Sequence, residues 1–94
     1  MTTLQVKVTV PKDILFNQVA NEMVLLNLAT GKYFSLDDVG TRMWNRIIEH
    51  DGDLGRAHQA LLREYQVEAR QLEQDLIELA DKLIGGGLLQ VAEA

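Results

Sequence analysis

The 94-residue sequence contains no cysteine, one proline and few aromatic residues. Without cysteine, disulfide frameworks, cysteine-ligated zinc, iron–sulfur clusters and thiol catalysis are excluded. No apolar run reaches the length of about eighteen residues that a membrane span needs, and the N-terminal residues lack the basic-then-apolar pattern of a signal peptide. The formal net charge of −5 disfavours a phosphate backbone as the main partner. These absences predict a cytoplasmic protein with neither a membrane nor a nucleic acid as partner.

What is present is the composition of one folded domain, 47% hydrophobic and 24% charged. We expect this domain to span residues 1–94, with a modest margin of stability. Acidic residues concentrate in residues 66–94, which hold six acidic and two basic side chains. They form either a solvated helix face or a surface that favours a partly positive partner.

The first third of the chain has the two-residue period of strands. Apolar residues alternate with polar ones over residues 4–10, so residues 1–13 are expected to be an N-terminal strand or a flexible arm. Residues 14–20 form a second extended candidate. Residues 23–28 are apolar on both faces, which is typical of a central strand. A turn at residues 29–32 and a short aromatic strand at 33–36 complete a hairpin, and the sheet is expected to cover residues 14–36.

The period becomes helical after residue 37. Ser35 or Asp37 is expected to cap a first helix that ends near Glu49, and Asp53 is expected to cap a second. A third, longer helix ends at the glycines 85–87, so three helices fill residues 37–87. Residues 88–94 are a tail whose residues 88–91 can pack back on the domain. The pattern predicts an α+β fold of winged helix-turn-helix type, a small antiparallel three-stranded sheet followed by three α-helices.

No catalytic residue, metal site or cofactor is expected. His50 and His58 lack the spacing of metal ligands and are interpreted as surface or helix-end residues. The glycines at 85–87 follow a helix, whereas a phosphate-binding loop precedes one. The paired acids Asp37 and Asp38 lie where a helix N-terminus favours negative charge, and Ser35 has no histidine at a motif-like spacing.

A winged-helix shape suggests nucleic-acid binding, but the third helix is acidic, which opposes contact with phosphates. The strand at residues 33–36 supports a different use. If it lies at a sheet edge, its free backbone groups can pair with an added peptide strand, beside the aromatic side chains of Tyr33 and Phe34. The alternative is that these aromatics simply alternate between core and solvent.

Two blocks of the sequence carry a family resemblance. The first is Gly31-Lys32-Tyr33-Phe34-Ser35-Leu36-Asp37-Asp38-Val39-Gly40, followed by Met43-Trp44. The second consists of Val67, Leu72, Asp75-Leu76, Leu79, Leu83 and Gly87-Leu88-Leu89. Together they resemble the PqqD-like proteins, the leader-peptide recognition domains of ribosomally made and modified peptides, from about residue 14 to residue 91.

The resemblance implies three strands, three helices and a non-catalytic module that binds the leader of a precursor peptide. In that family the leader adds as an antiparallel strand to the third strand, in a groove walled by the third helix. The positions that match this groove are Lys32, Tyr33, Phe34, Ser35 and Leu36 on the strand and Leu72, Asp75, Leu76, Leu79 and Lys82 on the helix.

Several of these positions have a second interpretation. Leu76 and Leu79 fit a core position equally well. Asp75 can accept a hydrogen bond from the leader or hold a basic residue of it, or it can be a solvated surface acid. Trp44 and Gly40 are assigned to packing.

The implied function is affinity and positioning, which raises the local concentration of the precursor at a partner enzyme. That enzyme is a leader peptidase, as in lasso-peptide systems, or a radical-SAM enzyme, as in quinone-cofactor (PQQ) synthesis. Two other functions stay open: a winged-helix DNA-binding protein, and a homodimer that exchanges residues 4–10 about Pro11.

Overall fold

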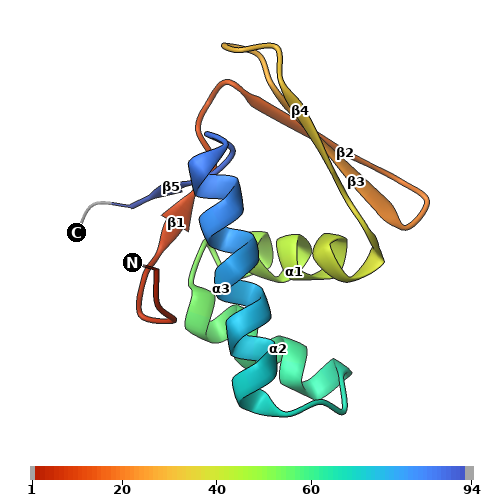
Figure 1. Cartoon of the computed structure of the whole chain (residues 1–94), viewed down its shortest axis with the longest axis vertical. Helices are drawn as coiled ribbons and strands as arrows, with labels where there is room; N and C mark the ends of the chain where they lie inside the picture. The colour runs from red at the N-terminus through yellow and green to blue at the C-terminus, as the bar shows by residue number, and fades with distance from the viewer. Residues whose placement is uncertain (1, 93–94) are drawn as a thin grey trace.

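Two small sheets and three helices make up the computed structural model, which describes residues 2–92 (Figure 1). In chain order the elements are β1 (Val8–Thr9), β2 (Ile14–Val19), β3 (Glu22–Asn27), β4 (Tyr33–Leu36), α1 (Asp38–Glu49), α2 (Leu54–Glu64), α3 (Ala69–Gly85) and β5 (Gln90–Val91). The predicted three-stranded sheet followed by three helices is confirmed. The winged-helix comparison is loose, because the sheet precedes all three helices and only the two-residue β5 follows α3.

The main sheet is an antiparallel meander in the order β2-β3-β4, so β4 is an edge strand. Ala20 takes a positive φ of 57° in the β2–β3 turn, and Gly31 takes one of 75° in the β3–β4 turn. The register pairs Phe16 with Leu25 and Leu25 with Phe34. Side chains from three strands therefore share a row on the face that looks toward the helices.

The outer face of this sheet departs from the sequence prediction. The sequence predicts that residues 23–28 are buried on both sides, as in a central strand. Only one face is covered, because all three helices lie on the inner side of the sheet (Figure 1). Val24 on the outer face is 38% exposed, and its neighbours Leu15 and Val19 are 55% and 62% exposed.

The N-terminal segment forms a much shorter strand than the alternating pattern predicts. Within residues 4–10 only Val8 and Thr9 are in a strand, and they pair antiparallel with β5 in a second sheet. Val6 N–H donates to the carbonyl of Thr3, which closes a turn and ends the extended stretch. Burial still alternates along the segment, and Val8 is only 1% exposed.

Local capping chemistry sets the helix boundaries. Asp37, rather than Ser35, caps α1, and its carboxylate accepts the Gly40 N–H at 2.8 Å. Asp53 caps α2 by accepting the Arg56 N–H. The interpretation of His58 as a surface or helix-end residue is wrong. Its side chain is buried in the middle of α2, and Nε2 lies 2.9 Å from the carbonyl oxygen of Ala69, which ties α2 to the start of α3.

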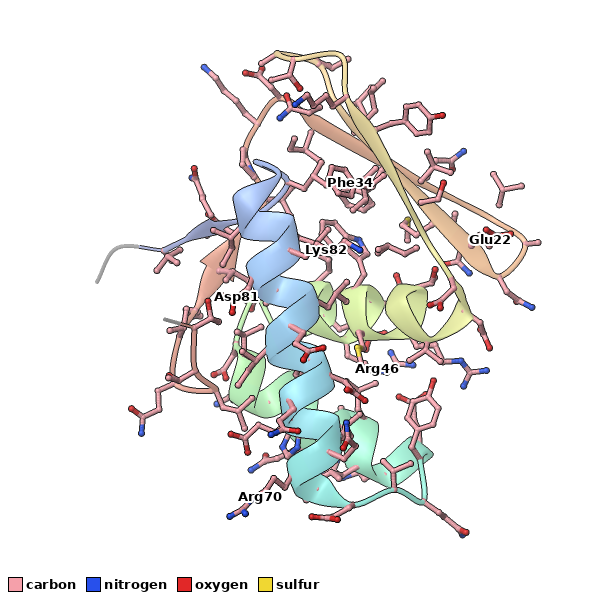
Figure 2. All side chains as sticks on the ribbon, in the orientation of Figure 1. Glu22, Phe34, Arg46, Arg70, Asp81 and Lys82 are labelled. Atoms are coloured by element: carbon pink, nitrogen blue, oxygen red, sulfur yellow. The ribbon has the colours of Figure 1, made fainter. Side chains whose placement is uncertain are left out.

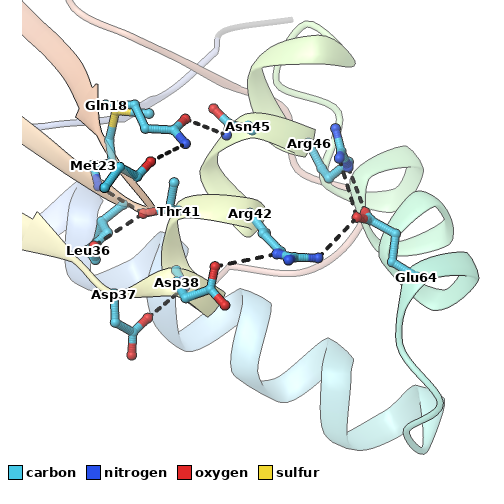
Figure 3. Close-up of polar contacts among 12 residues, drawn as sticks. Gln18, Met23, Leu36, Asp37, Asp38, Thr41, Arg42, Asn45, Arg46 and Glu64 are labelled. Atoms are coloured by element: carbon cyan, nitrogen blue, oxygen red, sulfur yellow. Dashed lines mark hydrogen bonds and ion pairs between the residues drawn. The ribbon is translucent and has the colours of Figure 1, made fainter.

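Helix α1 is joined to the sheet by one buried hydroxyl. Thr41 Oγ1 accepts the backbone N–H of Met23 at 2.9 Å and donates to the carbonyl of Leu36 at 3.2 Å (Figure 3). It therefore bridges β3 and β4 at the end of their ladder. Gly40 allows the close approach, since a Cβ there would lie 3.3 Å from the Leu36 Cβ.

The core lies between the inner face of the sheet and the three helices. Trp44 is fully buried, as predicted, and the ring of Phe16 meets it edge-on at 5.3 Å between centroids. The other completely buried large side chains are Leu25, Ile47, Leu54, Leu61, Leu76, Leu83 and Leu88. At roughly 25 cal/mol per Å² of apolar surface removed from water, burial of each such leucine contributes about 1.5–3 kcal/mol to stability.

Candidate functional site

The free edge of β4 offers unpaired backbone groups. Asn27 N–H donates to the carbonyl of Lys32 at 2.8 Å, which sets the phase of the β3–β4 ladder. Because hydrogen-bonded and non-hydrogen-bonded pairs alternate in antiparallel strands, Phe34 and Leu36 direct their backbone groups toward β3. The N–H and C=O groups of Tyr33 and Ser35 then point away from the sheet. The edge thus presents two donors and two acceptors for another strand.

The side chains of β4 are divided between the two faces of the sheet. Tyr33 is 70% exposed and Ser35 is also exposed, both on the outer face. Phe34 is half-buried on the inner face, and Leu36 is buried beside it. A strand added at this edge would therefore meet Phe34 on its inner side and Tyr33 on its outer side.

A groove of about 580 Å³ lies between the start of β4 and the C-terminal end of α3. In Figure 2 the labelled side chains of Phe34 and Lys82 lie in the space between the two elements. The residues that line the groove are Asn27, Thr30, Lys32, Phe34, Lys82, Gly85, Gly86 and Gly87. The groove therefore continues the free edge of β4 toward α3.

The glycines at the end of α3 shape this groove, a role that the sequence analysis missed. A Cβ at Gly86 would lie 2.8 Å from Phe34 Cζ, well inside van der Waals contact. Gly86 thus lets the Phe34 ring lie against the end of the helix. The sequence predicts only a helix stop at this glycine run, and no local signal links it to an aromatic residue 52 positions earlier.

On α3, a stripe of three side chains continues along the helix from the groove. Asp75, Leu79 and Lys82 are spaced by four and three residues, so they share one helix face. Asp75 is exposed, and its Oδ1 accepts a hydrogen bond from the Gln71 side chain at 3.0 Å. Leu79 is half-buried and packs against the core.

Three of the predicted site residues are buried in the core. Leu72 is 4% exposed and Leu76 is fully buried, since their positions on α3 face the other helices and the sheet. Leu36 is 7% exposed beneath α1. Their side chains are core residues in the free protein, and their contact with the leader stays a prediction. Of the ten predicted residues, Lys32, Phe34 and Lys82 line the groove itself.

The lysines at the groove have no ion-pair partner in the part of the chain that the structure describes. Neither Lys32 nor Lys82 forms an ion pair with any residue between 2 and 92. The strongest ion-pair network lies elsewhere, between α1 and α2, where the Arg46 guanidinium donates to Glu64 at 2.7 Å (Figure 3). This hydrogen bond lowers the pKa of Glu64 and raises that of Arg46.

Neither a metal site nor a membrane helix stands out in the part of the chain that the structure describes. No group of three histidine or acidic side chains within residues 2–92 is placed to hold a metal ion. No helix in that range has both the length and the apolar character to cross a bilayer. The groove beside the free edge of β4 has a chemistry that suits an extended peptide.

Comparison with known proteins identifies the family of this chain. A family model described as coenzyme PQQ synthesis protein D (PqqD) matches residues 22–89. The solved structure of TbiB1 in complex with the TbiA(beta) leader peptide is 30% identical, covering 90% of this chain and 98% of that one with a TM-score of 0.81. A lasso peptide synthetase B1 complexed with the leader peptide is 26% identical, covering 88% and 96%, with a TM-score of 0.74. No curated protein gives a significant match.

Proposed function

Because this chain belongs to the PqqD family, we propose that it binds the leader segment of a ribosomally synthesised precursor peptide and catalyses no reaction itself. The observation that carries the proposal is the free edge of β4 beside a groove whose other wall is α3. Both similar structures were solved with a leader peptide bound.

The leader adds to β4 as a fourth, antiparallel strand. The backbone groups of Tyr33 and Ser35 form up to four hydrogen bonds with it, each worth about 0.5–1.5 kcal/mol net. These bonds supply affinity without depending on the leader sequence. Alternate leader side chains then enter the groove, where they supply the specificity.

The residues of the groove contribute to leader binding in different ways. Phe34 provides an apolar surface between β4 and α3, and Lys32 and Lys82 stand on either side of it. Leu79 and Asp75 extend the helix wall along the leader, and the exposed Asp75 carboxylate accepts a hydrogen bond from it. The buried Leu36, Leu72 and Leu76 hold the two walls in place from below.

Binding places the precursor at a partner enzyme. A captured leader raises the effective concentration of the attached core peptide at any enzyme that also contacts this protein. The similarity to lasso peptide synthetase B1 favours a leader peptidase over a radical-SAM enzyme. We place this step in the cytoplasm, where precursor peptides are synthesised.

The alternatives have less support. DNA binding would bring the acidic α3 toward phosphates, which repel it. A dimer that exchanges residues 4–10 would have to withdraw the buried Val8 from its pairing with β5. Sedimentation velocity across a range of protein concentrations tests the dimer directly.

The proposal is tested by fluorescence anisotropy with the labelled leader of a precursor encoded beside this protein and, as a second probe, the TbiA(beta) leader peptide. We expect micromolar or tighter binding that Phe34→Ala weakens at least about tenfold, because truncation removes most of a buried aromatic contact. Val19→Ala, on the outer face at the far edge of the sheet, is the matched control and leaves binding unchanged. A folded protein that binds neither leader, or equal binding by both variants, contradicts the proposal.

A further inference from the structure

We propose that the end of the groove flanked by Lys32 and Lys82 is a subsite for an acidic side chain, so that the protein selects leaders with an aspartate or glutamate at one fixed position. This inference rests on the proposed function and adds a specificity that strand addition alone does not provide. Neither the family match nor the similar structures assign it.

The two lysines approach the groove from opposite walls. Lys32 comes just before β4 and, two residues from Phe34, shares its inner face of the sheet. Lys82 comes from the last turn of α3 and points toward the sheet in Figure 2. Both line the same groove, with Phe34 between β4 and the helix end. A carboxylate inserted there would have a cation on each side.

Lys32 and Lys82 differ from the other cations in lining one groove together without an ion pair. Arg42, Arg46 and Arg56 all form ion pairs with acidic neighbours. Within residues 2–92, no carboxylate lies within ion-pair distance of Lys32 or Lys82. In a chain of net charge −5, two cations left unpaired across one groove form a local positive site.

A structural role for Lys82 accounts for only part of this arrangement. A lysine in the last helical turn offsets the partial negative charge of the helix C-terminus. Three of the last carbonyls of α3 are already satisfied, since those of Lys82, Ile84 and Leu83 accept the N–H groups of Gly86, Gly87 and Leu88. Helix capping also gives no reason for Lys32, which lies on the opposite wall.

The charge of α3 is distributed in a way that keeps this end of the groove positive. Asp81, the neighbour of Lys82 in sequence, points to the opposite side of the helix in Figure 2. Asp75 shares the helix face of Lys82 but lies seven residues earlier, about 10 Å down the helix axis. The groove is thus basic at the start of β4, and Asp75 lies outside it, further along α3.

The sheet register predicts where the acid lies in the leader. An antiparallel strand places residues opposite Leu36, then Phe34, then Lys32 as it runs from its N-terminus to its C-terminus. Alternate residues share a face, so three leader positions spaced by two point into the groove. Their expected pattern is apolar, any, apolar, any, acidic. The acidic residue pairs with Lys32 across the strands and with Lys82 from the helix.

The test is a selection from a phage-displayed library of random peptides about twelve residues long. It is run on the wild-type protein, on the Lys32→Glu/Lys82→Glu double variant and on Arg70→Glu. Arg70→Glu is the control for the helix half of the double variant, because it makes the same charge change as Lys82→Glu on the same helix, at its far end (Figure 2). Selected peptides count as groove ligands only if Phe34→Ala weakens their binding.

We expect wild type and Arg70→Glu to enrich an aspartate or glutamate two residues after an apolar position, and the double variant to enrich lysine or arginine there. Replacing the acid in a selected peptide by alanine should weaken binding to wild type by about tenfold, the effect of one charged hydrogen bond. Added salt should reduce that difference.

The outcomes separate the two proposals. Groove ligands without an acidic preference, or an acidic preference that survives in the double variant, overturn the subsite and leave the proposed function standing. If no selected peptide depends on Phe34, the proposed function fails and the subsite fails with it.

Discussion

A proline at Ser35 tests whether a peptide adds to β4 as a strand. The Ser35 N–H points away from β3, so Ser35→Pro removes no hydrogen bond of the existing sheet. Edge strands tolerate proline when the lost N–H faces solvent. The pyrrolidine ring does occupy the place where a carbonyl of the added strand would accept that N–H.

The size of the effect follows from the number of bonds lost. Strand addition places up to four hydrogen bonds on Tyr33 and Ser35. Ser35→Pro removes one donor and hinders the neighbouring bond, which together amount to about 1–3 kcal/mol. Leader affinity should therefore fall by about 5- to 150-fold. Ser35→Ala, which keeps the N–H, should bind as wild type does.

The assay is fluorescence anisotropy with the labelled leader, alongside thermal unfolding of each variant. Gln18→Pro is the matched control, since Gln18 also directs its N–H away from β3, but at the opposite edge of the sheet on β2. The direction of the Gln18 N–H follows from the β2–β3 ladder. Leu28 N–H donates to the carbonyl of Asp13 at 2.9 Å, and hydrogen-bonded pairs alternate from there along the strands. Gln18→Pro should leave leader binding unchanged.

A folded Ser35→Pro variant that binds the leader with wild-type affinity refutes the strand-addition reasoning. A second measurement covers the case in which the proline destabilises the sheet. N-methylation of successive leader residues should weaken binding to the wild-type protein at every other position, because only alternate N–H groups face β4. Uniform tolerance of N-methylation refutes the same reasoning without any change to the protein.

Four further predictions concern stability and are measured by urea or thermal unfolding. Thr41→Val leaves two buried backbone groups without a partner and should destabilise the protein by about 2–4 kcal/mol, and a change below about 0.5 kcal/mol contradicts the bridging role. Gly52→Ala places a Cβ 1.7 Å from a backbone oxygen at a φ of 84° and should cost more than about 3 kcal/mol; near wild-type stability contradicts this. Tyr65→Phe removes a buried hydroxyl that has no partner within residues 2–92, so stability should stay the same or rise by up to about 1 kcal/mol, and a clear loss reveals an unseen partner. Arg46 holds the pKa of Glu64 below its ordinary value. This ion pair therefore stabilises the fold at pH values above the unfolded-state pKa of about 4.3. The stabilisation is lost as the pH falls through the lowered pKa of Glu64 in the folded state. Glu64→Gln should therefore make the free energy of unfolding depend less steeply on pH in the acid range. An unchanged slope contradicts this role of the ion pair.

Local patterns in the sequence identify most of the elements correctly. The strands at residues 14–19 and 22–27, the caps Asp37 and Asp53 and the helix end before Gly86 all depend on neighbours within a few residues. The prediction for residues 4–10 is only partly correct. Its alternation correctly predicts which side chains are buried, but a turn at residues 3–6 leaves a strand of only two residues.

Local sequence patterns predict the residues of the candidate site less well than they predict the helices and strands. Helical periodicity places Leu72 and Leu76 near Asp75 and Leu79, but it does not show which side of α3 faces the core. Only packing against the other helices makes the first two residues buried and leaves Asp75 exposed. His58 shows the same limit, because its partner is a carbonyl on the next helix.

The sequence by itself determined the order of the elements, their caps, the aromatic strand at residues 33–36 and the family, because each depends on local chemistry or on matched motifs. The tertiary structure alone decided that β4 is an edge, that Gly86 lies against Phe34, and that Lys32 and Lys82 line one groove. These residues are separated by about fifty positions in the chain. Their proximity depends on how α3 packs against the sheet, which is a property of the whole core and of no short segment.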